Sequence, residues 1–386
     1  MTPTRSRQQR PSQRLGRRLH PGAWWLWAIG LAAAASRTTN PFVLLLLCAV
    51  AGLVVANRRS DAPWARGFRF YLVLGLIIIT IRVAFRIVVG GQFGSTVLFE
   101  LPEIDLPDVT AGITLGGPVT LEGLLAAVYD GLRIATLLIC LGAANSLADA
   151  KRMLKSLPAA LYEIGVAVTV ALTVAPQLIE SGQRIRRARK LRGGTRPGVA
   201  RGVVIPVLDD ALDRSLVLAA AMDARGYGRR GAVGVRARRV TGALLLAGVF
   251  GVTIGTYGVL DGTTPRWLGG PILVAGCALA IVGLRVSGQR VQRTVYRPDP
   301  WRIEEWLVVA CGAGAAAVMF IATDVDPANL FPSLQPLQWP TIGLLPAVAA
   351  GLAALAGVIA PPVPSTTGTL PSTARTADDP ELVGVA

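Results

Sequence analysis

Two arginines, each followed directly by a glycine, are the residues best placed to do chemistry in this sequence. They are Arg192, followed by Gly193, and Arg225, followed by Gly226. Each ends a stretch with helical spacing, and glycine suits the left-handed residue that closes a helix. A planar guanidinium held at a rigid helix end can enter a groove and bind a carboxylate through two hydrogen bonds. The simpler interpretation, which spacing alone favours, is a C-terminal arginine stabilised by the helix dipole.

Five charged residues inside apolar segments form a second candidate set. They are Arg82, Arg86, Asp130, Arg133 and Glu163. Charges at membrane depth are rare and usually pair inside a helix bundle. Their functional interpretation is a proton or ion path, as in a secondary transporter. The structural interpretation, which we favour, is that they form ion pairs or reach the membrane interface through long side chains.

Other chemistry is not indicated by the sequence. The four cysteines each lie alone in an apolar segment, and without paired spacing they indicate neither disulfides nor a zinc site. The only histidine, His20, lies in a basic leader that we expect to be mobile. The sequence also has no lysine-bearing phosphate-binding loop. We therefore expect this chain to be no enzyme and to hold no metal and no cofactor of its own.

The composition of the 386-residue chain predicts a membrane protein. Hydrophobic residues make up 52% of it and charged residues only 16%, against about a quarter in soluble domains. Since a spanning helix needs roughly 20 apolar residues, we predict an all-α polytopic membrane protein with about eight transmembrane helices and a cytoplasmic helical segment rich in arginine. The first two candidate segments are short and form either a helical hairpin or one broken element. The candidates are 22–36, 41–56, 68–90, 121–147, 158–180, 241–260, 267–284, 306–323 and 341–361.

Lysine and arginine in the short connections predict the orientation, because cytoplasmic connections carry an excess of both. The connections 91–120 and 324–340 contain neither and carry acids instead, so we expect them outside. The N-terminus is then cytoplasmic. The predicted organisation is a basic cytoplasmic tail (1–21), N-terminal membrane helices (22–178), cytoplasmic arginine-rich helices (179–240), C-terminal membrane helices (241–361) and a disordered tail (362–386).

The segment 158–180 does not fit this alternation, since the residues before and after it both look cytoplasmic. Pro158 opens the segment and Pro176 lies near its end, and prolines bend or end helices. We expect the segment to dip into the membrane, or to bend and leave along its surface. The first cytoplasmic helix is then expected from about Pro176 to Leu191.

The second cytoplasmic helix is expected to start after Pro206 and to close at Arg225. Residues that recur at spacings of three and four form a mainly apolar stripe along it. This stripe can rest on the membrane surface or on other helices of the same protein. It consists of Leu208, Leu212, Ser215, Leu216, Ala219 and Met222.

Residues 121–230 resemble the T component of energy-coupling factor (ECF) transporters, the EcfT/CbiQ type, which is the shared membrane-coupling subunit of that family. The resemblance rests on residues 121–123 (Leu-Glu-Gly), 131–133 (Gly-Leu-Arg) and 156–158 (Ser-Leu-Pro), and above all on the two arginine-glycine helix ends. In that family the paired helix ends are ATPase-coupling motifs, each Ala-Arg-Gly or a close variant. The resemblance therefore implies that the helices of 179–240 are cytoplasmic coupling helices, which together form a cytoplasmic helical coupling segment.

The resemblance implies which residues make the coupling contacts. Residues 224–226 (Ala-Arg-Gly) match the motif directly, whereas Leu191 stands where the family usually has alanine before Arg192. Arg189 lies almost one turn earlier and can share or replace the role of Arg192. The implied coupling residues are Arg189, Leu191, Arg192, Gly193, Ala224, Arg225 and Gly226.

The resemblance also implies a set of partners in a bacterial plasma membrane. Two cytosolic ATPase subunits would bind the ATP, and a small substrate-binding membrane subunit would capture a vitamin or a metal ion. Besides these subunits and the lipid bilayer, no nucleic acid partner is expected. One alternative is a self-sufficient secondary transporter or channel that uses the intramembrane charges. Another is a membrane-anchored protein whose arginine-rich segment binds nucleic acid or anionic lipid.

Overall fold

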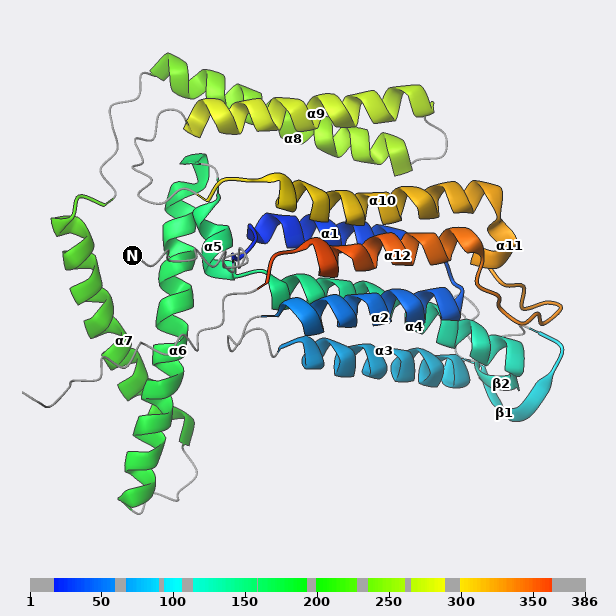
Figure 1. The fold of residues 1–386 in the computed structure, drawn as a ribbon. Helices are drawn as coiled ribbons and strands as arrows, with labels where there is room; N and C mark the ends of the chain where they lie inside the picture. The colour runs from blue at the N-terminus through cyan, green and yellow to red at the C-terminus, as the bar shows by residue number, and fades with distance from the viewer. Residues whose placement is uncertain are drawn as a thin grey trace, which may run out of the picture. The chain divides into compact units, whose positions relative to one another are not determined.

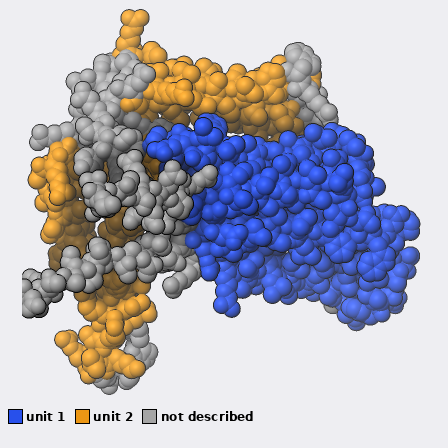
Figure 2. Space-filling model, in the orientation of Figure 1, with its two compact units in different colours: residues 1–150, 300–386 blue, residues 151–299 orange. Residues whose placement is uncertain are grey.

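The structure is a computed structural model, in which the chain divides into two compact units. One unit combines residues 1–150 with residues 300–386, and the other consists of residues 151–299 (Figure 2). The second unit is therefore an insertion into the sequence of the first. The residues that the structure describes are 17–59, 67–89, 94–105, 114–157, 159–192, 199–227, 235–260, 265–288 and 299–362.

The first unit is a bundle of apolar helices that run side by side (Figure 1). An antiparallel pair of strands, β1 (Val97–Asp105) and β2 (Thr114–Thr120), connects α3 to α4, where the sequence predicted only an external connection. The helices are α1 (Pro21–Ala35), α2 (Pro41–Arg58), α3 (Phe68–Val89), α4 (Leu121–Leu147), α10 (Ile303–Val325), the short α11 (Pro327–Leu330) and α12 (Leu344–Ile359).

The turn between α1 and α2 shows that the first two apolar segments are separate helices. The Asn40 side chain caps α2, because its Oδ1 accepts hydrogen bonds from the backbone N–H of Phe42 at 3.0 Å and of Val43 at 3.4 Å. Asn40 Nδ2 donates to the carbonyl oxygens of Asn329 and Thr341, each at 2.7 Å. The segments thus form a helical hairpin, and its turn is tied to the connection between α10 and α12.

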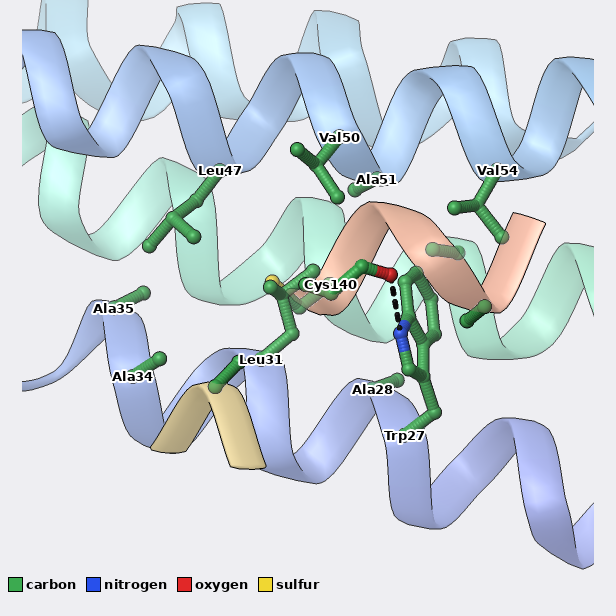
Figure 3. Close-up of a cluster of buried hydrophobic side chains, with 14 of the residues drawn as sticks. Trp27, Ala28, Leu31, Ala34, Ala35, Leu47, Val50, Ala51, Val54 and Cys140 are labelled. Carbon is green, nitrogen blue, oxygen red and sulfur yellow. Dashed lines mark hydrogen bonds between the residues drawn. The ribbon is translucent and has the colours of Figure 1, made fainter. Parts of the chain in front are cut away.

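Helices far apart in the sequence share the core of the first unit. The Trp27 side chain of α1 is fully buried, and its Nε1 donates to the carbonyl oxygen of Ala353 in α12 at 3.1 Å (Figure 3). Leu47 of α2 and Cys140 of α4 belong to the same cluster (Figure 3). Met319 of α10 is buried in it as well. The C-terminal helices α10 and α12 therefore complete the core that α1, α2 and α4 begin.

Two glycines set the close approach of α1 and α10. A β-carbon on Gly312 would lie 2.6 Å from the Cα of Trp27, and one on Gly30 would lie 2.5 Å from the carbonyl carbon of Gly312. Both contacts are with backbone, which cannot move aside as a flexible side chain can. Small residues at such crossings allow membrane helices to pack closely.

We expect Gly312→Ala to lower the stability of the purified protein by about 1–3 kcal/mol, because overpacking forces the backbones apart. Gly351→Ala in α12 is the matched control, since a β-carbon there meets nothing within 4 Å. Thermal unfolding in detergent measures both variants. Equal shifts in melting temperature would contradict the close contact between α1 and α10.

A buried carboxylate fixes the residues that lead into α1. The Glu305 side chain has no exposed surface and accepts hydrogen bonds from the Arg17 guanidinium at 3.0 Å, the backbone N–H of His20 at 3.3 Å and that of Arg302 at 2.9 Å. The expectation that the leader around His20 is mobile is therefore wrong for the stretch from Arg17 to His20. The earlier part of the leader lies outside the described residues.

The second unit contains two pairs of packed helices. A β-carbon on Gly276 of α9 would lie 2.4 Å from the carbonyl carbon of Gly251 in α8, so these two helices also approach through glycines. In the other pair, α7 packs against α6 (Figure 1). The elements are α5 (Ala150–Lys155), which begins at the unit boundary, the 3-10 turn η3 (Ala159–Leu161), α6 (Tyr162–Leu191), α7 (Val199–Ala224), α8 (Val235–Leu260) and α9 (Arg266–Gly288).

The helix lengths and composition confirm an all-α polytopic membrane protein. Among the described residues, seven helices are long and apolar enough to cross a membrane, namely α2, α3, α4, α6, α8, α9 and α10. The apolar α12 is shorter, with 16 residues. The predicted figure of about eight transmembrane helices agrees with these findings.

Two helix boundaries correct the sequence prediction. α6 is one continuous helix of 30 residues with Pro176 inside it, so no new helix begins near Pro176. α7 begins at Val199 and contains Pro206, although the sequence predicted its start after that proline. Each proline removes a single backbone N–H donor, and the many remaining hydrogen bonds of these long helices maintain them.

Candidate functional site: the arginine ends of α6 and α7

The end of α7 has the geometry that its sequence predicts. Gly226 has a left-handed backbone with φ of +74°. The Tyr227 N–H donates to the carbonyl oxygen of Met222 at 3.0 Å, and the Gly226 N–H donates to that of Asp223 at 2.9 Å. These two bonds are those of a Schellman motif, with Arg225 as the last residue before the left-handed turn. The motif fixes the backbone of Arg225 at the helix end and leaves its side chain exposed.

The end of α6 also presents an arginine. The helix ends at Leu191, which is 89% exposed. The N–H of the exposed Arg192 donates to the carbonyl oxygens of Ala188 at 3.2 Å and Arg189 at 3.1 Å. Gly193 lies outside the described residues, so the closing turn expected there stays a prediction.

Arg189, the alternative to Arg192, lies against the start of α7. A β-carbon on Gly202 would be 2.4 Å from Arg189 Nη1. The Arg189 guanidinium therefore occupies the contact between the two helices, whereas Arg192 is exposed beyond it. This placement favours Arg192 as the residue that a partner can reach.

The two arginine ends are far apart because α7 returns along α6. Arg225 lines a cavity together with Val166 and Thr169 from the first half of α6, whereas Arg192 follows the last residue of that helix. At 1.5 Å per residue, the helix from Thr169 to Arg192 spans about 35 Å. The two guanidinium groups therefore cannot enter one groove, and each is presented to a separate surface.

A polar link joins α6 to α7 midway between these ends. The buried Ser181 hydroxyl donates to Asp210 Oδ2 at 2.6 Å, and Arg214 Nε donates to Asp210 Oδ1 at 3.0 Å. These two hydrogen bonds, with the Ser181 hydroxyl contributing most, hold the pKa of Asp210 below its usual value. The link is therefore made by the ionised form of Asp210.

We expect the hydrogen bonds that Asp210 accepts from Ser181 and Arg214 to be lost only at acidic pH. Because the folded-state pKa of Asp210 is lowered, its contribution is complete above the unfolded-state value of about 3.9 and is lost as the pH falls through the folded-state value. Distances between spin labels on α6 and α7 should stay constant between about pH 7 and about pH 5 and change below about pH 4. Asp210→Asn should alter the distances at every pH, while Asp209→Asn, at an exposed position, serves as the control. A transition centred near about pH 6 would contradict this assignment.

The predicted apolar stripe of α7 faces away from α6 over most of its length. Leu208, Leu212 and Leu216 are 55%, 62% and 68% exposed, whereas Val203 is buried. Met222 is the exception, since it lines the cavity beside α6. The sequence predicted that this stripe rests either on the membrane surface or on another helix of the same protein. Among the described residues, Leu208, Leu212 and Leu216 are not covered by another helix.

The charged residues in apolar segments are not brought together into one group. Arg82 and Asp130 form an ion pair of 3.4 Å between α3 and α4, and both side chains are about half exposed. Arg133 donates instead to a backbone carbonyl at the end of α1, and Arg86 lies against the first turn of α4. Glu163 belongs to the other unit. These positions favour the structural interpretation over an ion path.

The cavity beside Arg225 was not predicted from the sequence. It has a volume of about 320 Å³ and lies between the end of α5, the first half of α6 and the last turns of α7. The available signal in the sequence was the basic stretch that ends at Lys155, a few residues before an apolar helix. That signal does not reveal the third wall, which forms only because α7 returns along α6.

Comparison with known protein families gives the identity of the chain at the family level. The family model described as cobalt transport protein, CbiQ, matches residues 12–233, which is more than half of the 386 residues. The chain therefore belongs to the cobalt transport protein family and is a multi-pass membrane component of transport. The resemblance to the EcfT/CbiQ type is confirmed. Among curated proteins, none matches the chain.

Proposed function

We propose that this protein is the membrane-coupling subunit of an ECF-type importer and that it hydrolyses no nucleotide itself. Membership of a transport family supports the general role. The observation that carries the finer assignment is the pair of exposed arginines, Arg192 and Arg225, at helix ends about 35 Å apart. Two separate ends fit two cytosolic ATPase subunits, with one guanidinium entering a carboxylate-bearing groove on each.

The continuity of α6 supports a mechanical role. Its first part, 162–179, contains one charged residue, whereas residues 180–191 contain six. We place the first part in the membrane and the second beneath it. When ATP draws the two ATPase subunits together, the ends of α6 and α7 move with them. The helices then tilt a small substrate-binding membrane subunit, which releases its cargo inwards.

The cargo that we propose is a metal ion or a vitamin, and the family description names cobalt. In this proposal a different polypeptide selects and holds the cargo. Among the described residues of this chain, no group of three or more histidine, cysteine or acidic side chains is placed to hold a metal ion.

We expect the N-terminus and the connection before α5 to be cytoplasmic. Arg17 contacts the start of α10, and Arg58 donates to the carbonyl oxygens of Gly357 and Val358 at the end of α12, so one end of the first unit is rich in arginine. In a variant without the native cysteines, an impermeant external reagent should label a cysteine at Glu100 but not one at Asp149 of intact cells. Labelling at Asp149 would contradict the orientation.

Affinity purification in mild detergent tests the proposed function most directly. Stable recovery of two ATPase subunits and a small membrane protein is the expected result. Transport of solute by the isolated chain in liposomes would instead identify a self-sufficient transporter and overturn the proposal. Salt-sensitive binding of nucleic acid, spread over many arginines, would identify a nucleic acid-binding protein.

A further inference from the structure

The cavity between α5, α6 and α7 has a feature that the coupling role does not use, namely its apolar interior. Its volume of about 320 Å³ lies at the lower end of the range for small-ligand sites. The apolar walls come from α6 (Val170), from α7 (Leu218 and Met222) and from the connection after α5 (Leu157). Because these side chains come from both sides of the α6–α7 contact, the cavity is formed by the tertiary packing of this unit.

The charged residues that line the cavity are all of one sign. Lys155 and Arg225 are the charged residues among those that line it, and no acidic residue is among them. The hydroxyl groups of Tyr162, Thr169 and Tyr227 provide further hydrogen-bonding groups. An apolar cavity with two cations and several hydroxyls is complementary to an anion that carries an apolar chain.

The position of the cavity in the sequence points to the source of such a ligand. α5 contains three basic residues, Lys151, Arg152 and Lys155, and an apolar membrane-type helix starts a few residues later. Basic residues directly beside an apolar span are typical of the cytoplasmic membrane surface, where they attract anionic lipid headgroups. A lipid also supplies both parts of the required ligand, a phosphate and an acyl chain.

We propose that this cavity binds one anionic phospholipid, with its phosphate at Lys155 and Arg225 and the start of an acyl chain against Leu218 and Met222. The volume accepts a headgroup and the first part of a chain, while the remaining chain stays in the bilayer. Assignment to the cytoplasmic leaflet rests on the proposed function and orientation. If Arg225 also binds an ATPase carboxylate, the phosphate and the ATPase compete for the same guanidinium.

Native mass spectrometry of the delipidated full chain, titrated with phosphatidylglycerol or phosphatidylcholine, tests this site without any ATPase present. We expect one phosphatidylglycerol to bind at least about tenfold more tightly than phosphatidylcholine. The double variant Lys155→Gln/Arg225→Gln should lose this preference. Arg187→Gln, which removes an exposed arginine of α6 outside the cavity, should retain it.

A second variant tests the apolar part of the site. A β-carbon on Gly165 would make only ordinary contacts, 3.4 Å or more, so Gly165→Leu should fill the cavity and weaken lipid binding while both cations remain. Glycerol phosphate, the headgroup without a chain, should not displace the lipid. Equal binding of the two lipids, or equal losses in the double variant and in Arg187→Gln, would overturn the proposal. Since the measurement uses the isolated chain, failure of the coupling proposal would leave its result unchanged.

Discussion

Arg225→Glu is expected to abolish recovery of the ATPase subunits or to uncouple ATP hydrolysis from uptake. The Schellman motif holds Arg225 at the end of α7, so the substitution places a carboxylate where we propose that a partner carboxylate binds. Loss of one partner of a desolvated charged pair costs about 3–5 kcal/mol, which weakens the contact by more than about 100-fold. Co-purification and uptake assays measure the two possible failures.

Two further substitutions separate a specific contact from a general effect of charge. Arg187→Glu makes the same charge change at an exposed position about one turn before the end of α6, where no glycine follows the arginine, and it should retain most of the co-purification. Arg225→Lys keeps the charge but cannot bind a carboxylate bidentately, so it should give co-purification between that of the wild type and that of Arg225→Glu. Unchanged uptake by Arg225→Glu would refute the assignment of this residue.

Glu305→Ala is expected to destabilise the first unit by about 3 kcal/mol. The Glu305 carboxylate is fully buried, and its removal leaves the Arg17 guanidinium and the backbone N–H groups of His20 and Arg302 without this acceptor. Buried donors that lose their acceptor carry the cost of desolvation. Unfolding by heat or by denaturant in detergent measures the effect.

Glu304→Ala is the matched control for Glu305→Ala. The Glu304 side chain is 46% exposed and lies 3.9 Å from Arg17, so its loss should cost less than about 1 kcal/mol. A double variant with Arg17→Ala should recover part of the loss in Glu305→Ala, because both members of the pair are then absent. Equal destabilisation by the two single glutamate variants would show that Glu305 is not held as described.

The positions of the long apolar helices along the chain could be predicted from the sequence because a span of apolar residues has few alternatives in a bilayer. The continuity of α6 through Pro176 could not be predicted from the sequence. The rule that prolines break helices takes account of the one hydrogen bond that is lost, but not of the hydrogen bonds that the rest of the helix keeps. The packing of α1 against α10 could not be predicted from the sequence either. Apolar periodicity shows that a helix has a face to bury, but not which helix buries it.

The same distinction holds for the candidate site. The end of α7 was predictable, since the arginine-glycine order determines a local motif that Gly226 and Tyr227 complete. The separation of the two arginine ends and the cavity beside Arg225 could not be predicted, because both depend on the return of α7 along α6. The coupling roles of Arg192 and Arg225, and the linear order of domains, stay predictions.

The interrupted first unit has a consequence for biosynthesis. Residues 151–299 must be translated between α4 and the helices that complete its core, which takes roughly 7–30 s at about 5–20 residues per second. During that interval Trp27 and Gly30 of the nascent chain have no α10 to contact. With 15 residues, α1 is also shorter than the roughly 20 that a stable span needs. A ribosome that stops before α10 therefore leaves an incomplete bundle, in which α1 can pack against α4 but lacks α10 and α12.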